Sequence, residues 1–239
     1  FDVGQGLSVA IHTQNHHMLY DLGASYDSGF NWAEAVILPA LKSQGIKHLD
    51  KVLVSHQDND HAGGLPYVLD SIPVHELYGS KGGQIPCVKS VQWHWDGVTF
   101  EVISPYNLTP YLKNNSSCVL KVYSEQGSML LTGDIESAVE YRLASHEAGL
   151  KSDVMLMPHH GSKTSSTPGF IKSVSPQWVV NSSGKYNPFN HPALEVIGRY
   201  DVPVYDTQQS GALTVSNYPE WQFSSFRKSN PKVWRMPVE

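Results

Sequence analysis

The sequence predicts a single α/β domain in which sheets are sandwiched between helices, and two features of the chain lead to this fold class. Short apolar runs with the length and composition of strands recur along the 239 residues, and segments with helical spacing of apolar residues lie between them. The chain contains no internal repeat, long linker or low-complexity tract that would mark a domain boundary. Residues 1–239 are therefore expected to form one domain.

The amino-terminal part of the chain alternates strand-like and helix-like segments. Two apolar runs separated by a polar turn predict a hairpin, and a β-branched run further on predicts a buried strand. A segment with near-helical apolar spacing stops at Gly45, a residue typical of helix ends. Residues 56–64 are polar and glycine-rich, which predicts a loop. The strands are expected at Leu7–His12, Met18–Leu22 and Lys51–Ser55, and the helices at Trp32–Gln44 and Leu65–Ser71.

The remainder of the chain is richer in strands. Gly and Pro separate the strand-like runs, and one helical pattern ends at Gly149. Residues 181–191 are expected to form a loop. The strands are expected at Val74–Leu77, Val91–Trp95, Thr99–Ile103, Ser117–Tyr123, Ser128–Thr132, Asp153–Met157, Gln177–Val180, Val202–Tyr205 and Ala212–Val215, and the helices at Ile135–Gly149 and Leu194–Tyr200.

Composition and charge exclude several classes of protein. With 40% hydrophobic and 16% charged residues the chain is neither disordered nor a coiled coil. No apolar run approaches the roughly 20 residues that a membrane span needs. The formal net charge of −5 gives no bulk attraction to nucleic acid, so a nucleic-acid partner must be argued from a site. The count of 12 His is high for this length and is the first sign of such a site.

The start of the chain and its two cysteines give further expectations. Phe1 lies within a strand-like run and no initiator Met precedes it, so we expect a domain excised from a longer protein. Cys87 and Cys118 cannot build a thiolate metal cluster. They either pair as a disulfide, as an oxidising compartment would allow, or remain as two separate buried thiols.

The segment from Ser55 to Gly64 carries the strongest chemical signal. His56, Asp58, Asp60 and His61 place four potential metal ligands within six residues, directly after a buried strand. Imidazole and carboxylate groups are good ligands for divalent ions, and crowding them on one loop has little structural use. The alternative is an ordinary polar surface loop, which this density of ligands disfavours.

Further acidic and histidine residues follow other apolar strands. Asp21, Asp134, His159, His160 and His191 each lie at or just beyond the end of such a run. Each has an ordinary explanation as a turn residue, helix cap or surface residue. Because the loops of α/β folds converge at strand ends, their repetition predicts one shared site.

These motifs resemble a known family. The order of the motifs is that of the metallo-β-lactamase fold, with its H-x-[HD]-x-D-H signature. The less specific of these motifs resemble one branch of that fold family. That branch is the metallo-β-lactamase-like domain of the ComEC family, the inner-membrane channel proteins of bacterial DNA uptake, and the resemblance runs from Phe1 to about Val215. The motifs are Asp2-Val3-Gly4-Gln5-Gly6, His56-x-Asp58-x-Asp60-His61, Asn115-x-Ser117, Leu131-Thr132-Gly133-Asp134 and His159-His160-Gly161-Ser162.

The resemblance implies an αββα four-layer sandwich with a binuclear metal site in the cleft between the sheets. One ion is expected on His56 and Asp58, and the other on Asp60, His61 and His160. The remaining implied roles are a bridging ligand (Asp134), a histidine facing the cleft (His159), a residue that orients a ligand (Asp21) and residues that line the substrate side (Ser162, Asn187 and His191).

The sequence departs from the wider family in ways that bear on the metal. Asp58 replaces the second His of the commonest signature, and the third His of a usual first site is absent. Asn115 and Ser117 occupy its region, and Leu7 follows Gly6 where many relatives have Asp. Oxygen in place of nitrogen favours Mn²⁺, with Mg²⁺ or Zn²⁺ as the other choices, and weakens the first position. We therefore expect one ion at rest and a second that arrives with substrate.

By resemblance, the function is that of a metal-dependent nuclease acting on DNA during natural transformation, degrading the strand that is not imported. A two-metal site activates water and stabilises the attacking and leaving oxygens of a phosphodiester. Asp60 is expected to be essential, and His159 or His191 to protonate the departing oxygen. The implied partners are DNA and the remainder of the membrane channel, with the domain on the extracytoplasmic face of the inner membrane and needing no lipid contact.

Two other functions remain open. Metallo-β-lactamase-fold phosphodiesterases that release small head groups share the His-His-Gly-Ser motif, so a small ester is an alternative substrate. A non-catalytic module that guides DNA is the other alternative. Its supporting residues would be basic and aromatic side chains near the cleft and in the carboxyl-terminal tail. The candidates are Lys163, Lys185, Tyr186 and Phe189, and in the tail Phe226-Arg227-Lys228, Lys232, Trp234 and Arg235.

Overall fold

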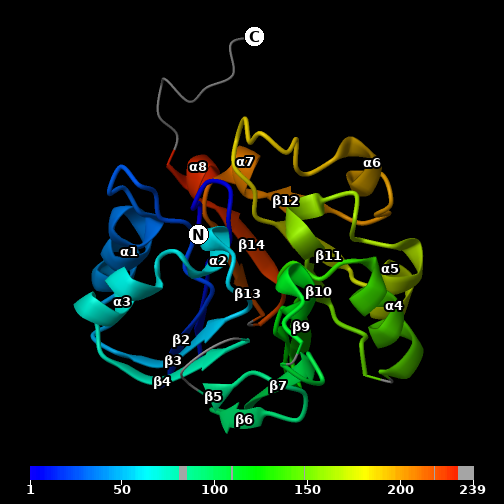
Figure 1. Cartoon of the computed structure of the whole chain (residues 1–239), viewed down its shortest axis with the longest axis horizontal. Helices are drawn as coiled ribbons and strands as arrows, with labels where there is room; N and C mark the ends of the chain where they lie inside the picture. The colour runs from blue at the N-terminus through cyan, green and yellow to red at the C-terminus, as the bar shows by residue number, and fades with distance from the viewer. Residues whose placement is uncertain (81–84, 109, 148, 218, 231–239) are drawn as a thin grey trace.

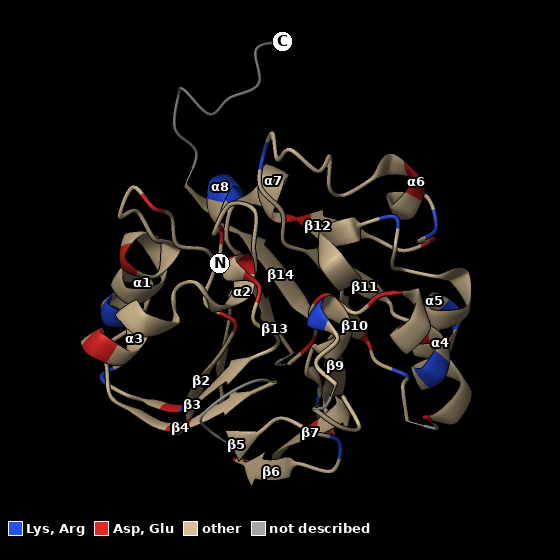
Figure 2. Cartoon of the chain, viewed as in Figure 1, with Lys and Arg blue, Asp and Glu red and all other residues tan. Residues whose placement is uncertain are grey.

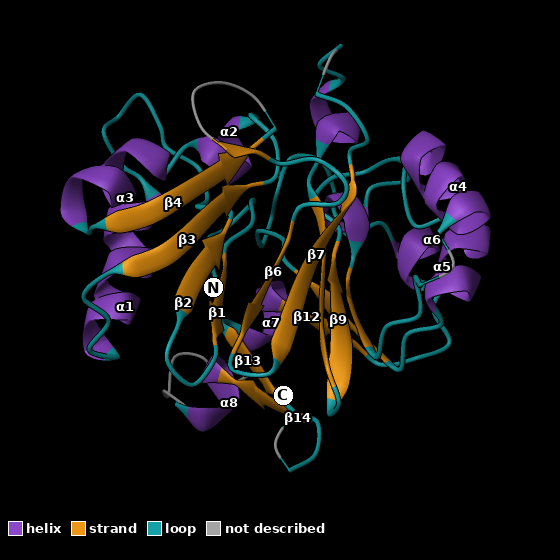
Figure 3. Ribbon diagram, turned by 90° about the horizontal axis from the view of Figure 1, so that it is seen from below, coloured by secondary structure: helices purple, strands orange, loops and turns teal. Residues whose placement is uncertain are grey.

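Two β-sheets face each other in the computed structural model, and helices cover the outer side of each sheet (Figures 1 and 3). The structure describes residues 1–80, 85–108, 110–147, 149–217 and 219–230, so Lys232, Trp234 and Arg235 lie outside the described residues. In this part of the chain α1 (Leu38–Ser43) and α3 (Leu65–Ser71) lie against the first sheet (Figure 3). The second sheet is covered by α4 (Ser137–His146), α5 (Pro168–Val174) and α6 (Leu194–Ile197). The order helix–sheet–sheet–helix is the four-layer sandwich expected from the sequence.

The first sheet holds the strands of the amino-terminal part. β1 and β2 form the predicted antiparallel hairpin, while β2, β3 and β4 run parallel to one another. Their carboxyl ends therefore lie at one edge of the sheet. Within the described residues the sheet order is β1 (Val9–His12), β2 (His17–Tyr20), β3 (Leu49–Val54), β4 (Val74–Gly79) and β5 (Ile85–Pro86).

The second sheet combines an antiparallel and a parallel part. β6 to β9 are joined as antiparallel neighbours, and β9 to β12 run parallel. The order is β12 (Val204–Asp206), β11 (Trp178–Asn181), β10 (Val154–Leu156), β9 (Gly127–Leu131), β8 (Val119–Ser124), β7 (Val98–Ser104) and β6 (Gln92–Trp95). A small sheet pairs β13 (Leu213–Ser216) with β14 (Gln222–Ser225).

Three apolar cores formed by described residues hold the layers together. Alternate side chains of a strand point to opposite faces of the sheet, so Leu53 of β3 enters the core between the sheets while Val52 enters the core beneath α1 and α3. The third core lies between the second sheet and α4, α5 and α6, where Phe170 is fully buried. Burial of both faces explains the apolar runs Val52–Val54 in β3 and Val154–Leu156 in β10.

The helices correct several expected boundaries. The segment expected as one helix at Trp32–Gln44 begins as a π-helix, Ala33–Ile37, and continues as an α-helix from Leu38. Pro39 lies in the first turn of this α-helix, where its missing N–H group leaves no internal hydrogen bond unmade. The described helices are α1 (Leu38–Ser43), α2 (Asn59–Ala62), α3 (Leu65–Ser71), α4 (Ser137–His146), α5 (Pro168–Val174), α6 (Leu194–Ile197), α7 (Thr207–Ser210) and α8 (Phe226–Ser229), with 3-10 turns at Lys113–Ser116 and Pro158–Gly161.

The loop predicted at residues 56–64 contains a short helix, α2, and close backbone contacts explain why glycines follow it. A Cβ atom on Gly64 would lie 2.2 Å from the Leu22 carbonyl oxygen, so only glycine fits beside the end of β2. A Cβ atom on Gly6 would likewise meet the Asp60 carbonyl oxygen at 2.5 Å. Sequence reasoning also missed the short elements β5, β14, α5, α7 and α8. Within the described residues, no helix combines the length and apolar composition needed to cross a membrane.

Cys87 and Cys118 are joined by a disulfide, which is one of the two alternatives left open by the sequence. Their Cα atoms lie 6.0 Å apart, and both residues are buried. Cys87 follows β5 of the first sheet and Cys118 precedes β8 of the second, so the disulfide links the two sheets. The backbone N–H of Cys118 also donates to the Ser55 carbonyl oxygen at 2.9 Å, next to the ligand-rich segment.

Removal of this link is expected to destabilise the protein. The disulfide closes a sequence separation of 31 residues, and a covalent link of that span stabilises by about 2–4 kcal/mol. Urea unfolding of the Cys87→Ala/Cys118→Ala variant should give a free energy of unfolding lower by that amount. Reductant should destabilise the wild type and leave the variant unchanged. An unchanged wild type under reductant would mean that the thiols are not paired in solution.

Candidate metal centre

The ligand-rich residues gather where the strands of the two sheets end. Asp21 follows β2, and His56 to His61 follow β3 and enter α2. Asp134 follows β9, and His160 follows β10. Because β2 and β3, and likewise β9 and β10, run parallel, these ends face the same space between the sheets.

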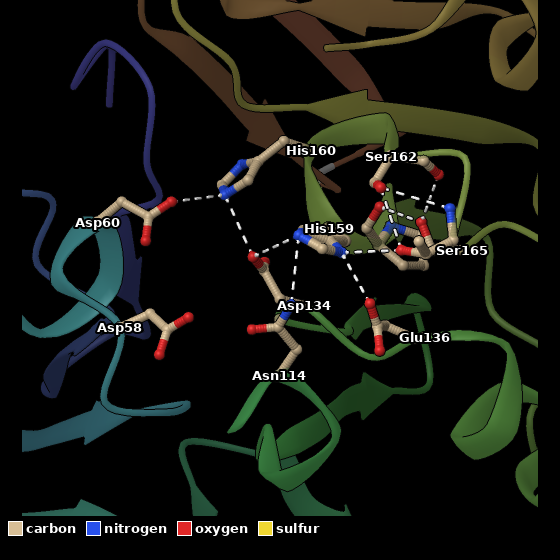
Figure 4. Close-up of polar contacts among 12 residues, drawn as sticks. Asp58, Asp60, Asn114, Asp134, Glu136, His159, His160, Ser162 and Ser165 are labelled. Carbon is tan, nitrogen blue, oxygen red and sulfur yellow. Dashed lines mark hydrogen bonds and ion pairs between the residues drawn. The ribbon is translucent and has the colours of Figure 1, made fainter. Parts of the chain in front are cut away.

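Four residues converge tightly in this space. Asp60, His61, Asp134 and His160 each offer one ligand atom, and these atoms all lie within 4.8 Å of one another. The Nε2 atom of His160 is 3.3 Å from Asp60 Oδ2 and 3.4 Å from Asp134 Oδ2, and the Nε2 atom of His61 is 3.1 Å from Asp134 Oδ2. Figure 4 shows Asp60, Asp134 and His160 turned toward one another.

The electrostatics of this group favour a cation. Burial disfavours the charged form of His160, but Asp134 and Asp60 outweigh it and raise the pKa of His160 to about 10. Burial likewise opposes protonation of His61, yet Asp134, Asp21 and Asp60 hold its pKa well above the usual value. Histidine protons thus balance the buried carboxylates, and a divalent ion would supply the same positive charge. Two carboxylate oxygens and two imidazole nitrogens are a fitting donor set for such an ion.

Both histidines of the group are oriented by contacts at their Nδ1 atoms. The Nδ1 atom of His61 lies 2.7 Å from Asp21 Oδ2, and that carboxylate also accepts from the Ser55 N–H and hydroxyl groups. The Nδ1 atom of His160 lies 2.7 Å from the Ser182 carbonyl oxygen. An N–H on each Nδ1 leaves Nε2 free to act as the ligand, which is the usual arrangement around metal-bound histidine.

His56 and Asp58 form a second, looser position beside the group. The Nε2 atom of His56 is buried with no hydrogen-bond partner among the described residues and lies 3.8 Å from Asp58 Oδ2. Burial is the main cause that lowers the pKa of His56 to about 4, so its imidazole is a neutral donor at pH 7. A buried nitrogen of this kind fits a metal ligand, but the Asp58 side chain is 47% exposed. Within the part of the chain that the structure describes, His56 and Asp58 are not part of a converging group of three or more ligands.

Asn115 and Ser117, which occupy the region of the missing third histidine, support neighbouring residues instead. Asn115 exchanges two hydrogen bonds of 3.0 Å with Glu136, one to its backbone N–H and one to its carboxylate. The Ser117 hydroxyl accepts from the Asp134 N–H at 3.1 Å and lies 3.4 Å from His56 Nδ1. These contacts fix the segment that carries Asp134, and neither residue belongs to the converging group of four ligands.

His159 lies at the rim of the group. Its Nε2 atom is 3.8 Å from Asp134 Oδ2, its Nδ1 atom is 3.2 Å from the Thr164 hydroxyl, and the side chain is 19% exposed. His159 and His160 both have positive φ angles, 51° and 53°, a left-handed conformation that costs non-glycine residues about 1–2 kcal/mol each. Two adjacent residues held in this way indicate a backbone shaped for the site.

The remaining expected residues line the surroundings rather than the group itself. Ser162 contacts Thr164, with 3.0 Å between the two hydroxyl oxygens. The Asn187 side chain holds the loop after β11 by hydrogen bonds to its backbone. Burial, then His159 and His160, lower the pKa of His191 to about 4, and its Nδ1 atom is buried with no hydrogen-bond partner in the described ranges.

Sequence reasoning missed several polar residues near the site. Asn114 Nδ2 lies 3.4 Å from His159 Nε2, and Glu136 Oε1 lies 3.8 Å from His159 Nδ1 (Figure 4). Glu136 is two residues beyond Asp134, and that proximity was the one available signal.

A separate group of possible ligands lies at the amino-terminal ends of β3 and β4, away from the site. It consists of His48, Asp50 and His75 and is partly exposed.

Comparison with known proteins identifies relatives of the chain. The family model described as "Metallo-beta-lactamase superfamily" matches residues 1–176. The chain is 38% identical over 229 residues to "Recombination protein 2" of Haemophilus influenzae and 38% identical over 221 residues to "Competence protein ComA" of Neisseria gonorrhoeae. It is also 30% identical over 279 residues to "ComE operon protein 3" of Bacillus subtilis. These alignments cover 92%, 89% and 96% of this chain and 28%, 31% and 35% of the relatives.

Solved structures share the fold at low sequence identity. The metallo-β-lactamase fold protein YhfI from Bacillus subtilis matches with a TM-score of 0.56 at 10% identity, covering 84% of this chain and 88% of that one. A putative metal-dependent hydrolase from Parabacteroides distasonis matches with a TM-score of 0.55 at 14% identity, covering 86% and 90%. The predicted fold is therefore confirmed.

The orientation of His61 by Asp21 gives a test of the metal centre. In Asp21→Asn the amide oxygen can still accept from Ser55, but the amide NH₂ then faces His61 Nδ1. That contact favours the tautomer with its proton on Nε2, which cannot bind metal. We expect Mn²⁺ affinity, measured by calorimetry, to fall about 10- to 100-fold. Asp70→Asn, an exposed acidic position on α3, is the matched control and should keep full affinity. Equal affinities in the two variants would contradict the orienting role.

The two positions are expected to differ in strength. Four converging donors predict one tight Mn²⁺ ion per chain, and the His56–Asp58 pair predicts a much weaker second one. Metal analysis after dialysis against rising Mn²⁺ should show these two steps, and His56→Ala should remove only the weaker. His75→Ala controls for the separate surface group. Two tight and equivalent zinc ions would be the opposite result.

Proposed function

The chain belongs to the metallo-β-lactamase superfamily and fits the ComEC-type domain of competence proteins, and we propose that it is a metal-dependent phosphodiesterase that cleaves DNA during natural transformation. The superfamily typically comprises metal-dependent hydrolases. The chain spans about a third of the curated relatives it matches, so the substrate and setting are part of the proposal.

The observation that carries this proposal is the converging group of Asp60, His61, Asp134 and His160. Divalent ions bound there supply a water of lowered pKa and positive charge against the attacking and leaving oxygens of a phosphodiester. The protein contributes the fixed geometry of the donors. Asp21 and Ser182 hold the two imidazoles in one orientation, so little reorganisation is needed when substrate binds.

A proton must reach the departing oxygen, and the geometry favours His159 over His191 for this role. His159 lies at the rim with part of its ring exposed and with its Nε2 atom toward Asp134. The pKa of His191, lowered to about 4, keeps that imidazole neutral at pH 7. We assign to His159 the transfer of a proton from Nε2, while Thr164 and Glu136 fix its Nδ1 side.

The donor set also bears on the choice of metal. Asp58, Asp60 and Asp134 give the two positions a large share of carboxylate oxygen, which suits Mn²⁺ or Mg²⁺ better than a nitrogen-rich site would. Histidine in both positions keeps affinity for a transition ion. We therefore propose Mn²⁺ as the working metal, with Mg²⁺ and Zn²⁺ as the comparisons.

The setting is proposed from the relatives and supported by the disulfide. Proteins named for competence and recombination are similar to this chain along nearly its whole length. We propose that the domain works beside the remainder of a membrane channel protein at the bacterial inner membrane and degrades the strand that is not imported. The Cys87–Cys118 disulfide favours the extracytoplasmic face, where such bonds persist.

Replacement of Asp60 tests the nuclease proposal. Asp60→Ala removes one of the four converging donors, so Mn²⁺-dependent cleavage of labelled DNA should fall by more than about 100-fold. Chelation of the wild type with EDTA should abolish cleavage, and added Mn²⁺ should restore it.

Asp70→Ala serves as the control for loss of an acidic side chain. Full activity of Asp60→Ala would refute the assignment. Hydrolysis of small phosphate esters without any DNA cleavage would instead favour the small-ester phosphodiesterase.

A further inference from the structure

The segment between β11 and α6 exposes two aromatic side chains. Tyr186 is 90% exposed and Phe189 is 63% exposed. Figure 1 shows this segment as the yellow trace along the upper side of the molecule, between the second sheet and α6. A single exposed aromatic residue needs no explanation, but two within four residues beside a candidate active site call for one.

This segment is held firmly despite its exposure. The Asn187 amide donates to the carbonyl oxygens of Gly184 and His191, and its oxygen accepts from the backbone N–H groups of Phe189 and His191. The Gln208 amide donates to the same two carbonyl oxygens. The exposed rings are therefore presented by a preorganised loop, which lowers the entropic cost of binding a ligand against them.

A row of rings leads from Phe189 to the metal centre. Phe189 stacks on His191, with ring centroids 5.6 Å apart and planes at 27°. His191 meets His159 edge-on at 5.7 Å, and His159 meets His160 at 6.3 Å. Since His160 belongs to the converging group, the row connects an exposed aromatic face with the proposed catalytic centre.

Among the described residues, little basic charge lies near the aromatic end of this row. Lys185 lies with its Nζ atom 5.1 Å from the centre of the Tyr186 ring, and Lys163 is paired with Glu195 at 3.4 Å. Over the described part of the chain, Lys and Arg are spread across many elements rather than gathered on one face (Figure 2). With a net charge of −5, attraction to phosphates alone would hold a strand weakly.

We propose that Phe189, backed by His191, is a stacking site for a base of single-stranded DNA, and that it places the adjoining phosphodiester at the metal centre. The inference rests on the proposed nuclease function and adds its substrate form. Every base offers a π-face, so such a site accepts any sequence. In a duplex the bases already stack on their neighbours, so single strands are the preferred substrate. Tyr186 is a second exposed aromatic side chain on the same loop.

The test compares two substrates that differ only in their bases. Cleavage is followed with Mn²⁺ on a single-stranded oligonucleotide and on an abasic oligonucleotide of the same length. Phe189→Ala should raise KM for the normal strand about 5- to 100-fold, with a smaller change in kcat. On the abasic strand the wild type and Phe189→Ala should have similar KM values. Phe189→Trp should restore the low KM on the normal strand.

The control removes an aromatic side chain of similar exposure elsewhere. Tyr141 on α4 is 75% exposed, and Tyr141→Ala should behave as the wild type on both substrates. Equal KM values for Phe189→Ala and the wild type on the normal strand would overturn the inference, as would an equal loss on both substrates or a preference for duplex DNA. Absence of cleavage by the wild type on every DNA would instead overturn the proposed function.

Discussion

The buried contact between Asp21 and His61 is the interaction on which the site depends. It joins the end of β2 to α2 and sets the imidazole so that Nε2 faces Asp134 of the other sheet. Ser55 binds the same carboxylate through its N–H and its hydroxyl, so the end of β3 is tied to it as well. An unpaired carboxylate at this depth would be costly, and these three donors are what make its burial tolerable.

The opposite wall combines backbone strain with the buried contacts of His160 to Asp134 and Asp60. His159 and His160 both occupy the left-handed region, and this places one ring at the rim and the next inside the group. An extended or right-handed helical backbone would orient these two adjacent side chains differently. Hydrogen bonds from the His159 N–H to Gly133 and from His160 to Ser182 hold this conformation. Buried polar contacts therefore fix both walls, and the second wall also contains a constrained turn.

The sequence predicted the layers of the fold and the convergence of ligands better than it predicted their supports. Short apolar runs located β3 and β10, and the density of ligands from His56 to His61 identified the centre of the site. The short helix α2 was missed, because a polar glycine-rich segment carries no apolar period. Asn114 and Glu136 were missed for another reason, since single polar residues reveal their partners only after the chain has folded. The pairing of Cys87 with Cys118 also required the sheets to be in place.

The net charge of the chain does not indicate how its site would interact with the phosphates of the proposed DNA substrate. The acidic residues that contribute to the value of −5 include Asp21, Asp60 and Asp134, which are partly or fully buried around one point. A bound divalent ion reverses the local sign, so the point that looks most acidic in the sequence becomes the one that attracts phosphate. The adjacent rings then supply affinity that does not depend on charge. The ion would attract the phosphate and the rings would stack on the base. Together they allow a protein whose basic residues are dispersed to bind a nucleic acid at one place.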